Sequence, residues 1–286
     1  MTWSPIPARQ FRNCLATVLG LASAHAIPAS AEDFALSISP PRFELSAEPG
    51  ETVRGVFELA NASSLAATLE FATAEWELAP DGGVITSKVL KEDSCRPWVA
   101  IERPSFTLQP KSQLRYRFEV TPPPETQPTE CRFAILVSGS DQRVSPSEQT
   151  SFPVAAQIAI IVYVAVGEVR PELRVVKADV VEVGGVLSPV IMVENSGTAH
   201  GRLSAFLKGA DAAGKKREFS VSTLPVLPGE TRMLALNVET GGDVVAAGRN
   251  TPAEDGRPDP IQYPLTMSGK MNDTVNTFSF DGVFEP

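Results

Sequence analysis

The stretch that most restricts the fold of this chain is an apolar run of fifteen residues, FPVAAQIAIIVYVAV, at 152–166. It carries no charge, and Gln157 is its one clearly polar side chain. A membrane-spanning helix needs about 20 apolar residues, so the run is too short to be one. Its valines, isoleucines and Tyr163 favour a strand, and a strand that is apolar on both sides is buried on both sides. We therefore predict one long strand over 154–166 that closes a first domain.

Shorter segments upstream alternate between apolar and polar residues. In QLRYRFEV, at 113–120, every second side chain is apolar, and TVRGVFEL, at 52–59, follows a similar pattern. Such a period of two is typical of half-buried strands. Turn-forming residues separate the segments, as in Glu48-Pro49-Gly50 and Pro80-Asp81-Gly82-Gly83. Many short strands with regular turns predict an antiparallel β-sandwich.

The second half of the chain repeats this organisation. The segments 58–71 and 192–207 both contain a strand, a polar turn that begins with Asn61 or Asn195, and another strand. The sequence therefore predicts an all-β fold with two immunoglobulin-like antiparallel sandwiches. We expect an N-terminal domain at 32–167 and a C-terminal domain at 168–286.

The first 31 residues have the three parts of a secretory signal peptide. Arg9 and Arg12 precede an apolar core at 14–26, and Ala29-Ser30-Ala31 forms a small-residue cleavage site. The alternative is an N-terminal membrane anchor, but the apolar core is short for one. We predict that residues 1–31 direct export and are removed, which leaves no membrane span.

The charge of the remaining chain excludes some partners. Residues 1–31 hold two of the 25 basic residues and no acidic one, so 23 basic and 34 acidic residues remain, a net charge of −11. Nucleic acids and anionic membranes select clustered lysine and arginine. We expect neither as a partner.

Two cysteines, Cys95 and Cys131, remain after the signal segment, which contains Cys14. In an exported protein such a pair most often forms a disulfide. Two separate buried thiols are the alternative.

The sequence contains no recognisable catalytic constellation. His25 lies in the signal segment, and His200 follows a polar turn, where we expect an exposed loop histidine. Glu75 and Glu77 flank Trp76, and we expect both carboxylates on the solvent face of a strand. Because no nucleophile, base or metal-ligand pattern is present, we predict neither an enzyme nor a bound metal or cofactor.

Several segments together resemble the PapD-like family of periplasmic pilus-assembly chaperones. They are ISPPRFELSAEPGETVRGVFELANAS, PSFTLQPKSQLRYRFEV, CRFAILV and AAQIAIIVYV, and they lie within residues 36–166. The resemblance implies two immunoglobulin-like domains at an angle and a subunit-binding cleft. It also implies a periplasmic location, no enzymatic activity, and an exported pilin-like subunit as partner, with an outer-membrane usher as an optional recipient.

The resemblance also implies site residues. Arg42 stands where the family has a first-strand arginine that anchors the carboxylate of the subunit, whereas Ile160 stands where the family has a second, lysine anchor. An exposed strand edge can bind a foreign strand through main-chain hydrogen bonds; an ordinary core strand is the alternative. The donor strand that the resemblance implies comprises Phe152, Val154, Ala156, Ile158 and Ile160.

Two functions follow as expectations. The first is a periplasmic chaperone that holds pilin-like subunits by donor-strand addition and assists their assembly. The second is a structural or adhesive envelope protein that uses the same two-sandwich fold, since one fold serves many functions.

Overall fold

The structure of the chain is a computed structural model. It describes residues 35–139, 142–147, 150–154, 157–239 and 260–286, with the backbone alone for 142–147 and 150–154. The predicted signal peptide at 1–31 lies outside these ranges. Within them the one helix is a single 3-10 turn, η1 (Arg96–Trp98), and no helix is long and apolar enough to cross a membrane.

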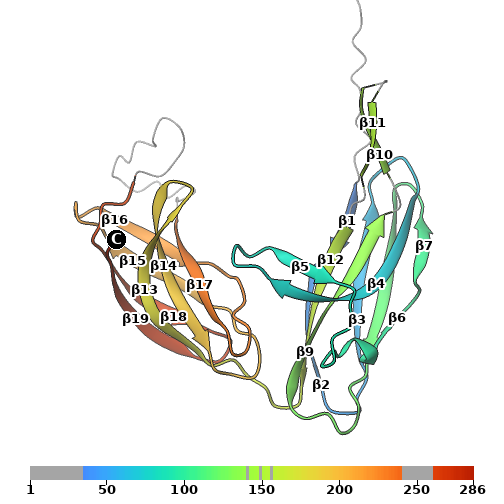
Figure 1. Cartoon of the computed structure of the whole chain (residues 1–286), viewed down its shortest axis with the longest axis horizontal. Coiled ribbons are helices and arrows are strands. Elements are labelled where there is room, and N and C mark those ends of the chain that lie inside the picture. Colours follow the sequence, from blue (N-terminus) through green and yellow to red (C-terminus); the bar gives the residue numbers. More distant parts are fainter. Residues whose placement is uncertain (1–34, 140–141, 148–149, 155–156, 240–259) are drawn as a thin grey trace, which may run out of the picture.

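The first lobe is a sandwich of two sheets (Figure 1). One sheet has the strand order β1 (Leu36–Ser39), β3 (Val53–Asn61), β8 (Ser112–Val120) and β6 (Val99–Ile101). The other has the order β2 (Arg42–Ala47), β12 (Gln157–Val166), β9 (Thr129–Gly139), β4 (Ala67–Leu78) and β5 (Val84–Ser87), and β7 (Ser105–Leu108) pairs with β4. A hairpin of β10 (Gln142–Ser147) and β11 (Thr150–Val154) extends beyond the end of this lobe.

The second lobe is one curled sheet that encloses its own core. Its order is β13 (Leu173–Val183), β14 (Val186–Asn195), β17 (Thr231–Val238), β16 (Lys216–Val221), β15 (Ser204–Ala210), β18 (Leu265–Asn272) and β19 (Thr277–Phe284). The two edge strands, β13 and β19, approach each other, so the sheet folds back into a sandwich. The predicted all-β fold with two sandwiches is confirmed.

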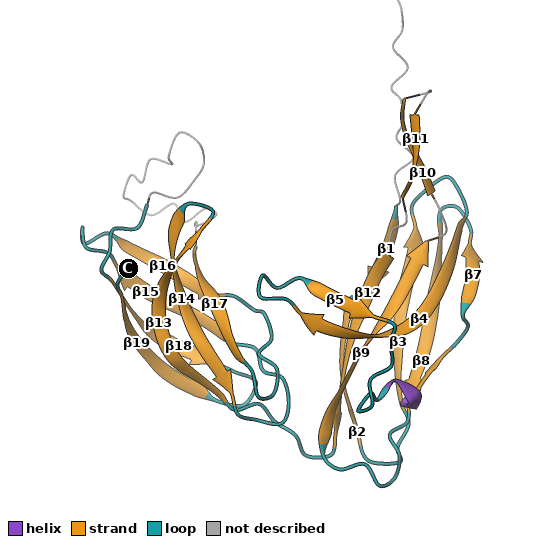
Figure 2. Ribbon diagram, viewed as in Figure 1, coloured by secondary structure: helices purple, strands orange, loops and turns teal. Residues whose placement is uncertain are grey.

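Each lobe has a separate hydrophobic core. The last strand of the first lobe ends at Val166 and the first strand of the second begins at Leu173. Figure 2 shows the lobes joined at one end and diverging from it. We propose that the chain divides into domains within this connection, as the boundary at 167/168 predicts.

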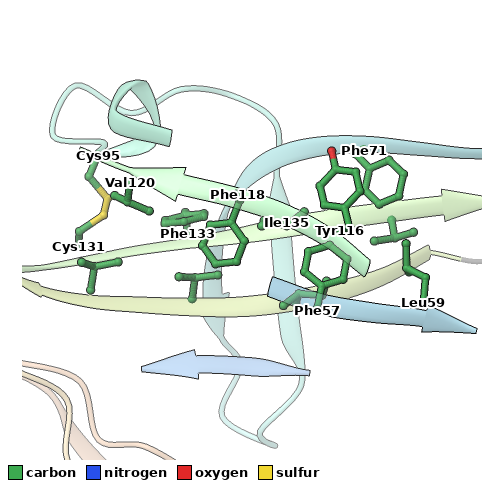
Figure 3. Close-up of a cluster of buried hydrophobic side chains, with 14 of the residues drawn as sticks. Phe57, Leu59, Phe71, Cys95, Tyr116, Phe118, Val120, Cys131, Phe133 and Ile135 are labelled. Carbon is green, nitrogen blue, oxygen red and sulfur yellow. A yellow bond between two sulfur atoms is a disulfide. The ribbon is translucent and has the colours of Figure 1, made fainter. Parts of the chain in front are cut away.

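Aromatic side chains fill the core of the first sandwich (Figure 3). Tyr116 is fully buried and stacks on Phe71, with ring centroids 4.2 Å apart, and on Phe57, at 5.0 Å. Each of the three comes from a different strand. Because every second side chain of a strand points to the same face, these rings all point into the one core. The alternation predicted at 113–120 is therefore confirmed by burial of Tyr116, Phe118 and Val120.

The described part of the apolar run lies in two strands, β11 and β12. β12 starts at Gln157, whereas Val154 belongs to β11 and residues 155–156 are not described. Val162 and Val164 point into the first core, and Tyr163 is buried on the opposite face. The prediction of burial on both faces therefore holds for this part of β12, whereas the predicted continuity of one strand from 154 falls on residues 155–156, outside the described residues.

The two sandwiches share an asparagine turn. Asn61 and Asn195 are both buried, and each side-chain oxygen accepts a hydrogen bond from the backbone N–H two residues on, at 3.0 and 2.9 Å. Each side-chain amide donates to the carbonyl four residues on, at 2.8 Å in both cases. A buried side-chain amide must be hydrogen-bonded. In both halves the asparagine meets this need by bonding the backbone of the turn that it begins, and it thereby holds the turn in place. The predicted repeat is confirmed at these positions.

Candidate functional site

Part of one edge of β12 is unpaired. β2 runs parallel to β12 only from Arg42, which is in register with Ile161. On that side, no strand among the described residues pairs with 157–160. Extending β2 backwards in register would place residues 38–41 there, but β1 instead pairs with β3 in the other sheet. Pro40 and Pro41 mark this change of sheet, and proline cannot donate to a strand ladder.

The backbone direction shows which groups the free edge presents. The amide of Ile161 donates to the carbonyl of Pro41, at 3.1 Å, so it points toward the β2 side. Backbone groups alternate in direction along a strand, and Ala159 and Gln157 therefore direct their N–H and C=O groups toward the same side. These groups are the template that strand addition requires.

The free edge leads into a polar cluster between the lobes. The members from the first lobe lie on the outer face of the sheet that contains β12, and the others follow β14 in the second lobe. We call this set the interdomain cluster: Arg42, Glu44, Glu130, Arg132, Tyr163, His200 and Arg202.

His200 joins the two lobes through Glu130. One carboxylate oxygen of Glu130, Oε2, accepts from the backbone N–H of His200 at 3.0 Å and lies 2.5 Å from its ring Nδ1. The His200 ring also stacks on Tyr163, with centroids 3.7 Å apart. Its side chain is 11% exposed, so the prediction of an exposed loop histidine is wrong. Glu130 and Tyr163 of the first lobe cover the His200 ring. This contact joins segments far apart in the chain, so the sequence alone did not indicate it.

Tyr163 lies at the centre of the interdomain cluster. Its burial raises the pKa of its hydroxyl to about 12, and the nearby positive charge of Arg202 opposes that rise. Trp76 packs edge-on against the Tyr163 ring, with centroids 5.4 Å apart, and Leu227 of the second lobe packs on the same group. The lobes are therefore held together both by the apolar packing of Leu227 on this group and by the polar contact between His200 and Glu130.

The hairpin of β4 and β5 makes a further contact between the lobes. The guanidinium of Arg232 is buried and donates to the carbonyls of Ala79 and Leu78, at 3.0 and 3.2 Å. Gly82, at the tip of the hairpin, has a φ of +87°, and Leu224 lies where a side chain would project. A larger residue there would be strained and would clash.

The predicted anchor, Arg42, lies at the exposed start of β2. Its side chain is 49% exposed, and its Nε lies 3.0 Å from the carboxylate of Glu44. Ile161, its neighbour in register, follows the free edge directly. Arg42 is therefore next to the surface to which strand addition would bring a ligand.

The predicted donor residues fall in three environments. Phe152 and Val154 lie in β11, which pairs with β10, and Ala156 lies outside the described residues. Ile158 is half-buried beside the free edge. Ile160 is fully buried in the core of the first sandwich, so its side chain is not available to a ligand and its prediction as a donor needs correction.

Sequence reasoning missed Arg202. Its side chain is 20% exposed, its Nε lies 3.7 Å from the carboxylate of Glu44, and its guanidinium carbon lies 5.9 Å from the centroid of the Tyr163 ring. Arg202 thus brings a second guanidinium, from the second lobe, to Glu44, the ion-pair partner of Arg42. A lone arginine after a turn gave no signal in the sequence.

Glu75 and Glu77 differ from each other, although both were predicted on a solvent face. Glu75 is buried, accepts a hydrogen bond from Ser94 at 2.5 Å, and pairs with Arg96 at 3.5 Å, so its prediction is wrong. Glu77 is exposed and pairs with Lys91 at 2.6 Å. Because Lys91 donates to that carboxylate, the pKa of Glu77 is lowered.

Cys95 and Cys131 form a disulfide, with Cα atoms 5.8 Å apart, as predicted. The bond links the residue before η1 to β9, and both cysteines are buried in the first core (Figure 3). Elsewhere in the described ranges, no group of three or more His, Cys, Asp or Glu is placed to hold a metal ion.

No protein-family model matches this sequence, and no curated protein matches it. Several solved structures are similar in fold. The Salmonella enterica SafB chaperone in complex with SafA pilin has 12% identity and a TM-score of 0.47, over 88% of this chain and 99% of that one. The Acinetobacter baumannii CsuC–CsuE chaperone–tip adhesion subunit complex has 14% and 0.43, over 88% and 99%. The E. coli chaperone DraB has 15% and 0.42, over 88% and 97%. These likenesses do not place the chain in a family.

Proposed function

We propose that this protein is a non-catalytic periplasmic chaperone that holds an exported, pilin-like subunit by strand addition. The observation that carries the proposal is the unpaired edge of β12 at 157–160, next to the interdomain cluster. A subunit strand would pair with the backbone groups of Gln157 and Ala159. Its terminal carboxylate would then reach Arg42, whose guanidinium can donate two parallel hydrogen bonds to it.

The half-buried side chain of Ile158 lies beside this edge, and the backbone of Phe152 and Val154 lies in the neighbouring hairpin. We propose 152–159 as the donor segment, in which the backbone of Gln157 and Ala159 pairs with the subunit and the side chain of Ile160 takes no part. The sequence resemblance of 36–166 to PapD-like chaperones supports this assignment. Transfer to an outer-membrane usher belongs to the same proposal, as does export by residues 1–31.

The proposal can be tested by co-purification. The tagged protein would be isolated from the periplasm of its own host under conditions of pilus-type gene expression, with mass spectrometry of bound proteins. We expect one small exported protein in a 1:1 ratio that loses its fold when separated. An Ala159→Pro variant should lose it, because proline removes the amide that points to the free edge.

The matched control is Ala159→Thr, which keeps the amide and favours a strand. It should retain the subunit. Recovery of the subunit by both variants would argue against strand addition at this edge. A wild-type protein that is stable and recovers no subunit would instead support the structural or adhesive alternative.

A further inference from the structure

The carboxylate of Glu44 lies among three basic side chains from both lobes. One of its oxygens, Oε1, is 3.0 Å from Nε of Arg42, 3.6 Å from Nε2 of His200 and 3.7 Å from Nε of Arg202. Arg42 and Glu44 lie two residues apart on the same outer face of β2, and the other two follow β14. A carboxylate thus already occupies the position toward which these groups converge.

The contact with Arg202 is incomplete. Its Nε is buried and makes no hydrogen bond, since the distance to Glu44 exceeds hydrogen-bonding range. Its terminal nitrogens donate to the carbonyl of Thr223 at 2.7 Å and to the hydroxyl of Tyr163 at 3.4 Å. A buried donor without a partner is costly, and an additional acceptor would therefore be favoured at this position.

The charge balance also favours an added anion. The interdomain cluster contains three arginines but two glutamates, and one of these, Glu130, is engaged by the ring and the backbone of His200. Glu44 is 46% exposed, so it can leave the cluster for water at low cost. An ion pair with this exposure is weak and can be exchanged.

We infer that Glu44 is an internal competitor, and that a ligand carboxylate displaces it to bind between Arg42 and Arg202. Arg202 is then the second cation of the carboxylate site, provided by the second lobe. The ligand is the C-terminal carboxylate of an extended peptide. This inference rests on the proposed function, because the free edge of β12 delivers such a peptide end to Arg42.

The test uses a defined probe in place of the unidentified subunit. The probe is an N-acetylated hexapeptide of alternating valine and threonine, made with a free C-terminal carboxylate and with a C-terminal amide. Its affinity would be measured by calorimetry for the full-length mature protein and for Glu44→Gln. We expect the acid to bind Glu44→Gln about twofold to fivefold tighter than wild type, and the amide to show no gain.

Two further variants locate the effect. Adding Arg202→Gln to Glu44→Gln should remove the gain. Glu119→Gln is the matched control, because Glu119 forms a comparable exposed pair with Arg54, at 2.7 Å, outside the interdomain cluster. It should bind both probes as wild type does. Circular dichroism and thermal melting would confirm that each variant is folded.

Equal or weaker binding of the acid by Glu44→Gln, or no binding by either form at millimolar probe, would overturn the inference. The result is separable from the proposed function. A subunit recovered from the periplasm, with no effect of Glu44→Gln on the probe, would remove only the competitor role. A selective gain for the acid without any recovered subunit would keep the carboxylate site and remove the chaperone role.

Discussion

Replacing Ile160 with lysine will lower the free energy of unfolding of the first sandwich by about 4 kcal/mol or more. Ile160 is 0% exposed and packs in the first core with Val162 and Val164. A lysine there loses the apolar contacts and buries an ammonium group without a partner. Position 160 is where the family resemblance implies a lysine. In this protein that position is buried, so a lysine there should destabilise the first sandwich.

Urea unfolding followed by tryptophan fluorescence would measure this effect on the first sandwich. Trp76 and Trp98 both lie in that sandwich, and Trp3 is in the segment predicted to be cleaved. The control is Ile161→Lys, whose side chain lies on the opposite face of β12 and is only partly buried, so this change should cost less than half as much. If Ile160→Lys were as stable as wild type, the assignment of Ile160 to the core would be wrong.

Removing the disulfide should have an effect of similar size. The Cys95→Ala, Cys131→Ala double variant should lose about 4 kcal/mol, because the bond closes a loop between residues 36 apart in sequence. The bond constrains the unfolded chain more than the folded one, so the loss should appear as a lower urea midpoint in the same fluorescence assay. Reduction of the wild-type protein provides the control, since it should give nearly the same midpoint as the double variant. A midpoint unchanged in both would contradict a stabilising role of the bond.

Much of the fold could be predicted from local patterns in the sequence. Alternation in 113–120 predicted which side chains are buried, since the strand period depends only on the backbone. The two asparagine turns could be recognised because Asn61 and Asn195 begin similar polar segments. The cysteine pair followed from the expected compartment. Each of these depends on residues that are close in sequence or on simple counting.

The candidate site could be predicted only in part, because it depends on contacts between distant segments. Arg42 was singled out through the resemblance, but Arg202 and His200 reach Glu44, the ion-pair partner of Arg42, only when the second lobe packs against the first. His200 is covered for the same reason. Counting positions along β12 identified Ile160 as the place of a missing cation, yet strand parity turns that residue inward. The change of sheet at Pro40 and Pro41, which uncovers the edge of β12, likewise has no signature in the apolar run itself.

The most direct test of the central claim is hydrogen exchange of two backbone amides, in the free protein and in its isolated 1:1 complex with the subunit. The amides of Gln157 and Ala159 point to the unpaired edge, so both should exchange fast in the free protein and slowly in the complex. Amides of β9, which is already paired with β12 over its length, should change little. Protection of Gln157 and Ala159 alone along this edge is the result that strand addition predicts. Unchanged exchange at both amides in a stable complex would show that the subunit is held elsewhere.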